Sequence, residues 1–227
     1  MKKNRPLISV IVATHNNSDT IVESLNSIFN QNYQNFEVLV VDDASEDDTL
    51  KKLNKMKNDK LKVFSNSNNI GLTKSLNLLI KESKGDYIAR HDSDDISFPN
   101  RFSEQINAMR KKNKVVCTTR AITMQTNKII PGKSFYISPK LVIRFKNPFV
   151  HGTLMIKKSC LEEIGFYDES FYYAQDYKLF SDLIKSKYKI INLKKILYSL
   201  NTENNISSNF KDEQNYFANK VKKGMKN

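Results

Sequence analysis

Three carboxylates lie within four residues at Asp92-Ser93-Asp94-Asp95, directly after a short apolar run. Carboxylates this close repel one another, so each is costly to ionise unless a cation joins them. A hard divalent ion, Mg²⁺ or Mn²⁺, prefers oxygen ligands and often takes substrate phosphates as well. We therefore expect a divalent-metal site here. The alternative is an acidic start of the helix that Pro99 opens, since acidic residues favour helix starts.

The elements that position this cluster can be predicted from apolar runs. Runs rich in Val, Ile and Leu that are too short for helices predict buried strands. They cover residues 7–13, 36–41, 61–64 and 87–89. Between them, apolar residues recur at helical spacing, so residues 7–91 alternate strand and helix four times. This pattern predicts an α/β fold with a mostly parallel, Rossmann-like sheet flanked by helices.

Polar groups follow three of the predicted strands. Thr14-His15-Asn16 follows the first strand, Asp42-Asp43 the second, and the acidic cluster the fourth. In an open parallel sheet, ligands bind outside the carboxyl ends of the strands. We therefore expect the three groups to meet at one edge of the sheet and to form one site.

Local signals mark the helix ends. Thr20 with Glu23 predicts a capping box, Ser45 predicts the N-cap of the next helix, and Gly85 predicts the end of the third. Later in the chain the pattern is less regular. There we expect strands at 115–119, 128–130, 153–156, 190–193 and 196–200, the last two at a sheet edge, and helices at 139–148 and 177–183.

Charge is divided unevenly along the chain. Of the 227 residues, 37 are Lys or Arg and 24 are Asp or Glu, a net charge of +13. Residues 1–100 carry 13 basic and 14 acidic residues, whereas residues 101–227 carry 24 basic and 10 acidic ones. The excess in the second part indicates a polyanionic neighbour, such as an anionic membrane, a phosphorylated substrate or a nucleic acid, or else compositional drift.

The sequence lacks the signals of several protein classes. Two cysteines, Cys117 and Cys160, rule out a disulfide scaffold and fit a reducing compartment. No apolar run approaches the ~18 residues of a membrane span, and no signal-peptide pattern opens the chain. No Gly-rich phosphate loop follows the first strand, which counts against dinucleotide oxidoreductases, ATPases and nucleotidyltransferases. Without a zinc spacing or a basic zipper, we expect no nucleic-acid partner.

Taken in order, five stretches resemble the signature of family 2 glycosyltransferases with the GT-A fold. They are residues 8–16, 27–31, 40–45, 69–72 and 85–95. The resemblance extends from about Pro6 to about Ser207, so it implies a single GT-A domain at residues 1–207. Within it, residues 1–95 are expected to bind the nucleotide-sugar and residues 96–207 the acceptor. Residues 208–227 are expected to form a basic helix or tail.

The resemblance implies an inverting transfer of a sugar from a nucleotide-sugar, with a UDP-sugar as the expected donor, to a hydroxyl of a glycan or lipid-linked acceptor in cell-surface polysaccharide synthesis. It also implies Mn²⁺ or Mg²⁺ held by Asp94 on the donor diphosphate. Carried over by position, Thr14 and Asn16 would line the nucleotide pocket. Asp43 would hydrogen-bond the base, and Asp92 would face the ribose or the sugar.

Inversion requires a carboxylate that deprotonates the acceptor hydroxyl. Similar enzymes place it in a Glu-Asp pair at a helix start, and here the pair reads Gln175-Asp176. Asp176 is therefore the expected base rather than only a helix cap, and Gln175 is expected to position substrate. His151 and Asp95 are expected on the acceptor side. Lys74 matches a basic position near the nucleotide, or else it is an exposed helix lysine.

Three other positions bear on this resemblance. Arg101 is expected to form an ion pair with the acidic cluster. At Leu200 and Thr202, similar enzymes often carry an Arg and a His that reach the diphosphate or the metal. The neutral residues here leave open an alternative, a non-catalytic family member that binds a nucleotide or a glycan.

The basic second part suits an acceptor on a lipid diphosphate. Lys140, Arg144 and Lys146 are interleaved with apolar residues, of which Leu141 and Phe145 are two. Such a segment rests on anionic lipid, or else it is a packed helix with a solvated basic face. We therefore expect a cytoplasmic protein that contacts the inner face of the plasma membrane peripherally.

Overall fold

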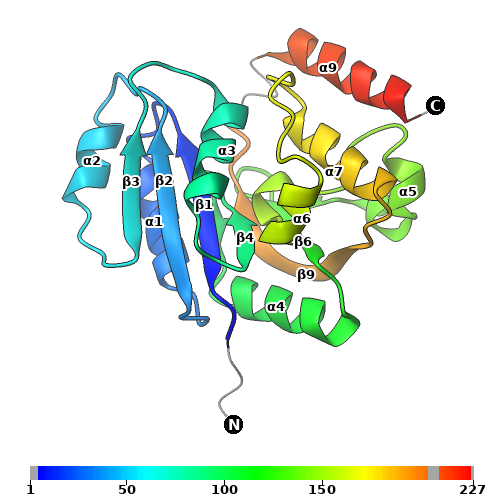
Figure 1. Cartoon of the computed structure of the whole chain (residues 1–227), viewed down its shortest axis with the longest axis horizontal. Helices are drawn as coiled ribbons and strands as arrows, with labels where there is room; N and C mark the ends of the chain where they lie inside the picture. The colour runs from blue at the N-terminus through cyan, green and yellow to red at the C-terminus, as the bar shows by residue number, and fades with distance from the viewer. Residues whose placement is uncertain (1–4, 204–209, 226–227) are drawn as a thin grey trace.

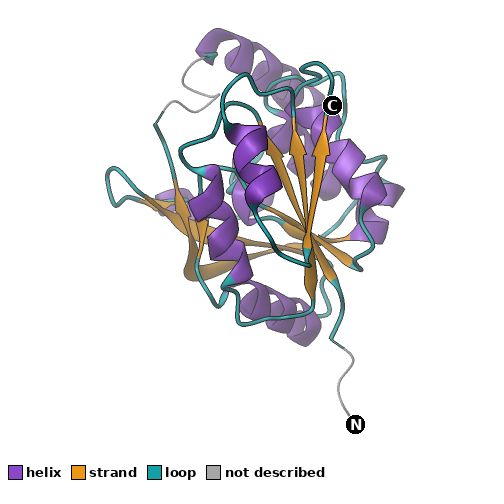
Figure 2. Cartoon of the chain, turned by 90° about the vertical axis from the view of Figure 1, so that its left-hand side faces the viewer, coloured by secondary structure: helices purple, strands orange, loops and turns teal. Residues whose placement is uncertain are grey.

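One nine-stranded sheet runs through the molecule, with helices against both of its faces (Figures 1 and 2). The computed structural model describes residues 5–203 and 210–225. The strands are β1 Ile8–Thr14, β2 Phe36–Asp42, β3 Leu61–Ser65, β4 Tyr87–Arg90, β5 Ile96–Ser97, β6 Val116–Thr123, β7 Ile129–Ile130, β8 Met155–Lys157 and β9 Ile190–Leu200. The helices are α1 Ile21–Phe29, α2 Thr49–Lys55, α3 Leu72–Glu82, α4 Arg101–Lys112, α5 Pro139–Val142, α6 Lys158–Glu163, α7 Gln175–Lys185 and α9 Lys211–Gly224, with 3₁₀ turns η1 Lys133–Tyr136 and η2 His151–Thr153.

The strand order is β3-β2-β1-β4-β8-β6-β9-β5, with β7 paired to β6. β1 is parallel to β2 and β4, and β2 is parallel to β3, so the predicted alternation of strand and helix is confirmed. Every residue of β1 is buried because helices cover both faces, and this explains its continuous apolar run. The carboxyl ends of β1, β2 and β4 therefore lie at one edge of the sheet.

The second half of the sheet is mixed. β8 is antiparallel to both β4 and β6, whereas β9 is parallel to β6 and antiparallel to β5. The two edge strands predicted at 190–193 and 196–200 are one strand, β9, which pairs with β6 on one side and with β5 on the other side only at Tyr198 and Ser199. The division into two strands was wrong because Lys194 and Lys195 are exposed where the pairing with β6 shifts register, so they interrupt the apolar pattern without ending the strand.

Two polar residues predicted as helix caps bind loops instead. The Thr20 hydroxyl makes no capping bond at α1, so the predicted capping box is wrong. It donates to the Ser93 carbonyl oxygen at 3.2 Å. α2 begins after Asp48, so Ser45 is not its N-cap and lies in the preceding loop. Both side chains therefore stabilise the edge of the sheet at which the polar groups gather.

Gly85 does not end α3, which stops at Glu82. It lies instead against β1, where an added Cβ would be 2.5 Å from the Ser9 nitrogen. Glycine is required here because the chain passes too close to the strand for any side chain.

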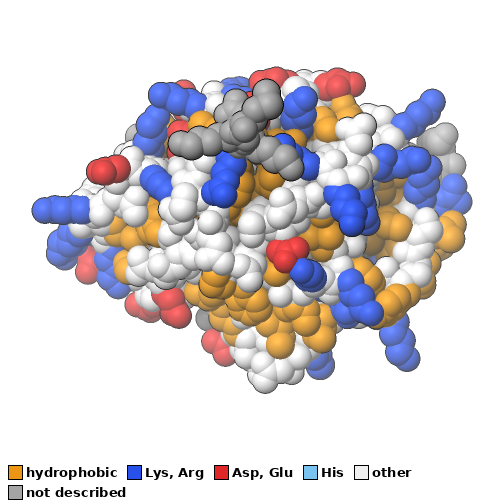
Figure 3. All heavy atoms as spheres, turned by 90° about the horizontal axis from the view of Figure 1, so that it is seen from below, with side chains coloured by type: hydrophobic (Ala, Val, Ile, Leu, Met, Phe, Trp, Pro, Cys, Tyr) orange, Lys and Arg blue, Asp and Glu red, His pale blue; other side chains and the backbone are white. Residues whose placement is uncertain are grey.

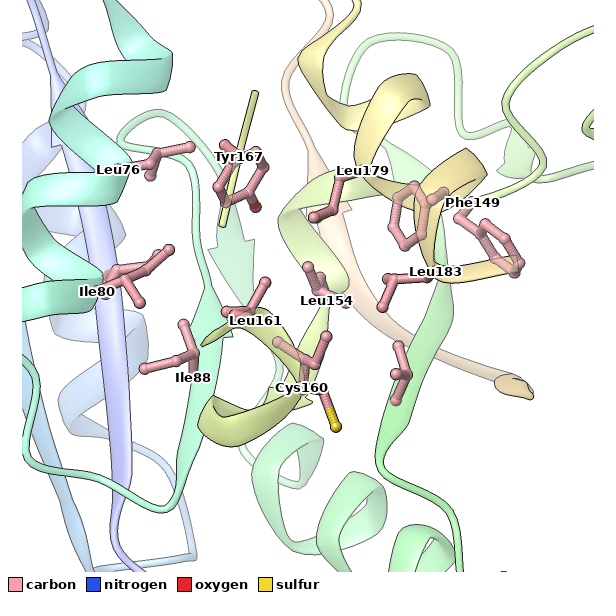
Figure 4. Close-up of a cluster of buried hydrophobic side chains, with 14 of the residues drawn as sticks. Leu76, Ile80, Ile88, Phe149, Leu154, Cys160, Leu161, Tyr167, Leu179 and Leu183 are labelled. Carbon is pink, nitrogen blue, oxygen red and sulfur yellow. The ribbon is translucent and has the colours of Figure 1, made fainter. Parts of the chain in front are cut away.

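A hydrophobic core joins the two halves of the sheet. Figure 4 shows Leu76 and Ile80 of α3 on one side of the cluster and Leu179 of α7 on the other, with Leu161 of α6 between them. Val221 of α9 belongs to the same core, and Figure 1 shows α9 beside α7. The elements that carry residues 92–95 and Asp176 are therefore packed against a common set of side chains.

The surface is basic in many places. Figure 3 shows Lys and Arg side chains distributed around the face seen from below in Figure 1, with acidic and hydrophobic side chains between them. The distribution of charge on this face therefore does not by itself indicate a binding surface. Over residues 5–203 and 210–225, no helix combines the length and the apolar character needed to cross a membrane.

Candidate active site

The acidic cluster follows β4 directly and is held by a buried arginine. Arg90 donates hydrogen bonds to the Asp92 carboxylate and to the His91 carbonyl oxygen. The Asp92 N–H donates to the Tyr198 hydroxyl oxygen at 3.0 Å, and the Asp92 carbonyl oxygen accepts from Ser24 Oγ at 2.9 Å. Contacts from β4, β9 and α1 therefore fix Asp92 together.

Asp94 lies two residues beyond Asp92 and is half-buried. Burial and the nearby Asp92 carboxylate raise the pKa of Asp94 to about 6. An ionised Asp94 is therefore costly, and a bound cation would offset that cost. In the part of the chain that the structure describes, no three His, Cys, Asp or Glu side chains are grouped to hold a metal. Asp94 thus fits Mg²⁺ or Mn²⁺ when substrate oxygens and water complete the coordination, which is the usual arrangement for Mg²⁺.

Asp95 is buried beneath the cluster and already accepts a hydrogen bond. Its Oδ1 accepts from the Asn201 N–H at 2.7 Å, which ties the cluster to the end of β9. Burial, with Asp92 and Asp94 nearby, raises the pKa of Asp95 well above its usual value. The cluster therefore contains two half-buried carboxylates, Asp92 and Asp94, and one buried carboxyl group, Asp95.

The segment around Leu200 and Thr202 has a structural task. Thr202 donates from its N–H to Gln125 Oε1 at 2.9 Å, and the Gln125 amide donates to Asn201 Oδ1 at 2.6 Å. Together with the bond between Asn201 and Asp95, these contacts link the loop after β6 to the acidic cluster. The segment that contains Leu200 and Thr202 thus helps to hold the acidic cluster in place through Asn201.

A buried polar layer lies under the cluster. Arg101 donates to the Arg90 carbonyl oxygen at 2.6 Å and to Ser97 Oγ at 2.7 Å. Its predicted ion pair with the cluster is wrong, because among the described residues Arg90 forms that pair. The two ring nitrogens of His91 lie 2.8 Å from Ser24 Oγ and 3.1 Å from Ser97 Oγ, and burial with Arg101 nearby lowers the His91 pKa well below its usual value.

The loops after β1 and β2 are joined around Asn16. Its N–H donates to Ser45 Oγ at 2.9 Å, and its Oδ1 accepts from the Glu46 N–H at 2.8 Å. Asn16 has φ of 54°, a left-handed conformation that asparagine adopts more readily than most residues. Next to it, the buried Thr14 hydroxyl has no hydrogen-bond partner among the residues that the structure describes. This hydroxyl is therefore suited to a ligand or a water.

Asp43 organises the loop between β3 and α3. Its Oδ1 accepts from Asn66 Nδ2 at 2.7 Å and from the Ile70 N–H at 3.0 Å, and its Oδ2 accepts from the Gly71 N–H at 2.8 Å. Gly71 has φ of +88°, which glycine adopts without strain, and α3 begins directly after it. Lys74 lies in the first turn of α3 with its side chain exposed. The buried Asp43 thus sets where α3 begins and where Lys74 lies.

The turn η2 packs over the acidic cluster from the second half of the molecule. A Cβ added to Gly152 would lie 2.6 Å from Asp92 Oδ2 and 2.5 Å from the Tyr198 hydroxyl oxygen. A side chain at residue 152 would therefore displace the carboxylate. This contact brings the segment predicted for the acceptor side against the end of β4.

His151 lies in the field of two acidic groups. Its Nε2 is 2.7 Å from the Tyr167 hydroxyl oxygen. Burial and the Arg90 guanidinium lower the pKa of His151 to about 4, against the opposing effect of Asp176 and Asp92. The imidazole is therefore neutral near pH 7.

Asp176 occupies the first turn of α7, one residue after the half-buried Gln175. Its Oδ2 accepts from Asn147 Nδ2 at 2.7 Å. The helix starts after Ala174, which has φ of 53° and donates its N–H to Gln214 Oε1 of α9 at 3.2 Å. The position of the Asp176 carboxylate thus depends on a loop residue and on a distant helix.

The sequence pattern did not indicate Asn147, Tyr167, Tyr198 or Gln214 as site residues, although all four shape this site. Each meets a partner more than ten residues away in the chain, so no local spacing reports the contact. Of the four, Tyr198 could have been identified from the sequence. It is a tyrosine within an apolar strand run, and a buried tyrosine hydroxyl needs a hydrogen-bond partner.

The chain matches the family model described as Glycosyl transferase family 2 over residues 9–165. EpsE of Bacillus subtilis, named as a glycosyltransferase, is 35% identical over 71% of this chain and 60% of its own length. A glycosyltransferase of Haemophilus influenzae is 31% identical over 97% of this chain and 73% of its own length. The Escherichia coli UDP-Glc:alpha-D-GlcNAc-diphosphoundecaprenol beta-1,3-glucosyltransferase WfaP is 30% identical over 82% of this chain and 73% of its own. The match thus spans between three fifths and three quarters of these relatives.

Two solved structures have the same fold. Staphylococcus aureus TarS 1-349 in complex with UDP-GlcNAc superposes with a TM-score of 0.74 at 25% identity, covering 87% of this chain and 59% of TarS 1-349. The mannosyltransferase PcManGT of Pyrobaculum calidifontis, in complex with GDP-Man and Mn²⁺, superposes with a TM-score of 0.72 at 20% identity, covering 93% and 61%. The sheet described above is therefore the GT-A fold, and the chain belongs to glycosyl transferase family 2.

Proposed function

We propose that this protein transfers a sugar, with inversion, from a UDP-sugar to a hydroxyl of a lipid-linked glycan in cell-surface polysaccharide synthesis. The donor is supported by TarS, solved with UDP-GlcNAc, and by WfaP, which is named for UDP-Glc. The acceptor is supported by WfaP, whose name gives a sugar on diphosphoundecaprenol.

One observation carries this proposal: the turn that contains His151 and Gly152 lies directly against Asp92, and the Asp176 carboxylate is near enough to oppose the lowering of the His151 pKa. Asp92 lies against Gly152 from the end of β4, and Asp176 acts on the His151 imidazole from α7. Sugar transfer needs polar groups for the donor diphosphate on one side and a base for the acceptor hydroxyl on the other. This arrangement has both.

On the donor side, Thr14, Asn16 and Asp43 line the nucleotide pocket in our proposal. The unpaired Thr14 hydroxyl is suited to a nucleotide hydrogen bond, and Asp43 contacts the base through a carboxylate that also holds residues 66–71. Asp92 faces the ribose or the sugar, and the exposed Lys74 ammonium lies near the phosphates. Lysine is a common phosphate ligand because its charge is compact and mobile.

Asp94 is the proposed ligand of Mn²⁺ or Mg²⁺. A cation bound there would offset the negative charge that the departing diphosphate gains. Arg90 holds Asp92 by a direct ion pair, so Asp94 is the carboxylate of the pair that is left for the cation. PcManGT, solved with Mn²⁺, supports this choice of metal.

On the acceptor side, Asp176 is the proposed general base. It takes the proton of the acceptor hydroxyl while the oxygen attacks the anomeric carbon on the face opposite the leaving UDP. Asn147 orients the carboxylate through Oδ2 and leaves lone pairs for the acceptor. Gln175 and His151 position the acceptor by hydrogen bonds. Asp95 is buried and holds Asn201, so its proposed part on the acceptor side is to support the site and not to contact the acceptor.

The same proposal assigns residues 1–95 to the donor and residues 96–207 to the acceptor within one GT-A domain, at the cytoplasmic face of the membrane. The boundary at Ser207 lies outside the described residues. The predicted basic C-terminal part contains α9, which packs on α7.

The test is a screen of nucleotide-sugars with the purified protein, Mn²⁺ and a short-chain lipid-diphosphate sugar, with product analysis by NMR. We expect UDP release from one UDP-sugar, a product of inverted anomeric configuration, and loss of both in EDTA. Tight UDP binding without release from any donor would favour the alternative, a binding-only family member. Retention of configuration would overturn the proposed role of Asp176.

A further inference from the structure

Exposed apolar side chains are concentrated in one segment of the chain. Among the described residues, nine large apolar side chains are exposed, and five of them fall within residues 129–145. The most exposed are Tyr136 (69%), Ile137 (51%), Leu141 (55%) and Phe145 (71%). Single exposed apolar residues are ordinary on protein surfaces, but a group of them indicates a contact surface. We refer to residues 136–145 as the docking segment.

The docking segment is fixed in place rather than loosely attached. In α5 and the turn after it, Val142 and Ile143 are buried, whereas Leu141 and Phe145, four residues apart, are exposed on one side. The Tyr177 hydroxyl donates to the Ile143 carbonyl oxygen at 2.5 Å, which joins the segment to α7. Its exposed side chains are therefore presented by a helix turn with an anchored inner face.

Along the chain, the charge on either side of this segment has one sign. Residues 105–161 contain twelve Lys and Arg and no Asp or Glu. Lys133, Lys140, Arg144 and Lys146 are exposed, and no ion pair within the described ranges involves them. Aromatic and aliphatic side chains flanked by unpaired basic ones are typical of surfaces that lie in the interface of an anionic bilayer.

We infer that the docking segment inserts its apolar side chains into the interface of an anionic phospholipid bilayer, while Lys140 and Arg144 contact the headgroups. The purpose of this membrane contact rests on the proposed function, in which the acceptor is linked to a lipid. Asn147, two residues beyond the segment, donates to the Asp176 carboxylate at 2.7 Å. An acceptor anchored in the same bilayer therefore reaches the proposed base beside the membrane surface.

Vesicle flotation tests this inference with the whole chain. We expect the protein to float with vesicles of phosphatidylglycerol and phosphatidylcholine at moderate salt, and not with phosphatidylcholine alone. The double variant Leu141→Glu/Phe145→Glu should lower the bound fraction at least about tenfold, because it removes two apolar side chains that would enter the bilayer and adds two negative charges that the anionic headgroups repel. Val22→Glu is the matched control, since Val22 is exposed on α1, at the opposite side of the molecule in Figure 1.

A second pair of variants keeps the inference testable if the double variant fails to fold. Lys140→Gln/Arg144→Gln leaves the apolar side chains in place and should weaken flotation, whereas Lys55→Gln/Lys57→Gln on and after α2 should not. The inference would be overturned if the two variant pairs floated to the same extent. It would also be overturned if the wild-type protein floated equally well with vesicles of phosphatidylcholine alone. A protein that floats as expected but releases UDP from no donor would retain the membrane surface and disprove the proposed function.

Discussion

The two halves of the sheet hold their polar groups in different ways. At the ends of β1, β2 and β4, neighbouring loops bind each other through many short contacts, such as the three N–H groups on Asp43. On the side of α5 and α7, Asp176 depends on Asn147 and on the contact of Ala174 with Gln214, both far away in the chain. The donor side is therefore built by loops that adjacent parallel strands bring side by side, whereas the acceptor side is built by helices and loops whose packing the sheet register does not set.

The largest effect is expected on the donor side, from Asp94→Ala. Transfer should fall at least about 10³-fold, because the variant removes the proposed metal ligand and a bound metal supplies several kcal/mol of charge stabilisation. UDP affinity measured by calorimetry should then be the same in Mn²⁺ and in EDTA. Asp59→Ala, an exposed acid before β3, is the control and should keep the metal dependence. Normal Mn²⁺-dependent UDP binding by Asp94→Ala would contradict the assignment.

The acceptor side is tested by Asp176→Asn. We expect kcat to fall about 10²- to 10⁴-fold, the usual range for loss of a general base, while UDP affinity stays unchanged. Asn147→Ala should lower kcat less, since the carboxylate remains and loses one hydrogen bond, while its Oδ1 still accepts from the Tyr177 N–H. Steady-state kinetics and UDP calorimetry on the same samples separate these effects. Near-normal turnover by Asp176→Asn would show that another group is the base.

The boundary between the halves is tested by a pair of glycines. Gly152→Ala should reduce the free energy of unfolding by about 3 kcal/mol, because its Cβ would overlap the Asp92 carboxylate and the Tyr198 hydroxyl. Gly132→Ala is the matched control, since the nearest atom to its added Cβ is 3.8 Å away. Urea unfolding measures both. Equal stability of the two variants would mean that η2 is not packed tightly on the cluster.

The smallest effect concerns pH and His151. Its pKa of about 4 in the folded state lies below the usual 6.5, so the unfolded chain binds more protons between these values. Stability from this group is therefore complete above pH 6.5 and is lost as pH falls toward 4, by on the order of 2 kcal/mol at pH 5. His151→Gln, which does not titrate, should show a correspondingly flatter stability curve in urea unfolding at pH 5 to 7.5. Parallel curves for the two proteins would contradict the buried neutral imidazole.

The donor side could be predicted well from sequence for a physical reason. Helices cover β1 and β2 on both faces, so each strand is a continuous apolar run and the polar residue after it must lie at the carboxyl edge. The same local reasoning failed where a side chain serves a neighbouring loop. Ser45 has the features of an N-cap, yet its hydroxyl accepts from Asn16.

The acceptor side was predicted only in part. The helix start at Asp176 is a local signal, but its partner Asn147 and the close approach at Gly152 arise from packing between separate segments. β9 was divided in two because its exposed Lys194 and Lys195 resemble a turn. Exposure and pairing of this kind depend on the neighbouring strand, which no single stretch of sequence encodes.

The hydrogen bond from Ala174 to Gln214 has a consequence for biosynthesis. The two residues are 40 positions apart, so at ~5–20 residues per second the ribosome makes Gln214 some seconds after Ala174. A nascent chain that has been made as far as β9 can pair its strands. It still lacks Gln214, whose side-chain oxygen accepts the hydrogen bond that fixes the start of α7. Catalytic competence should therefore mature later than the sheet, once α9 has emerged and docked.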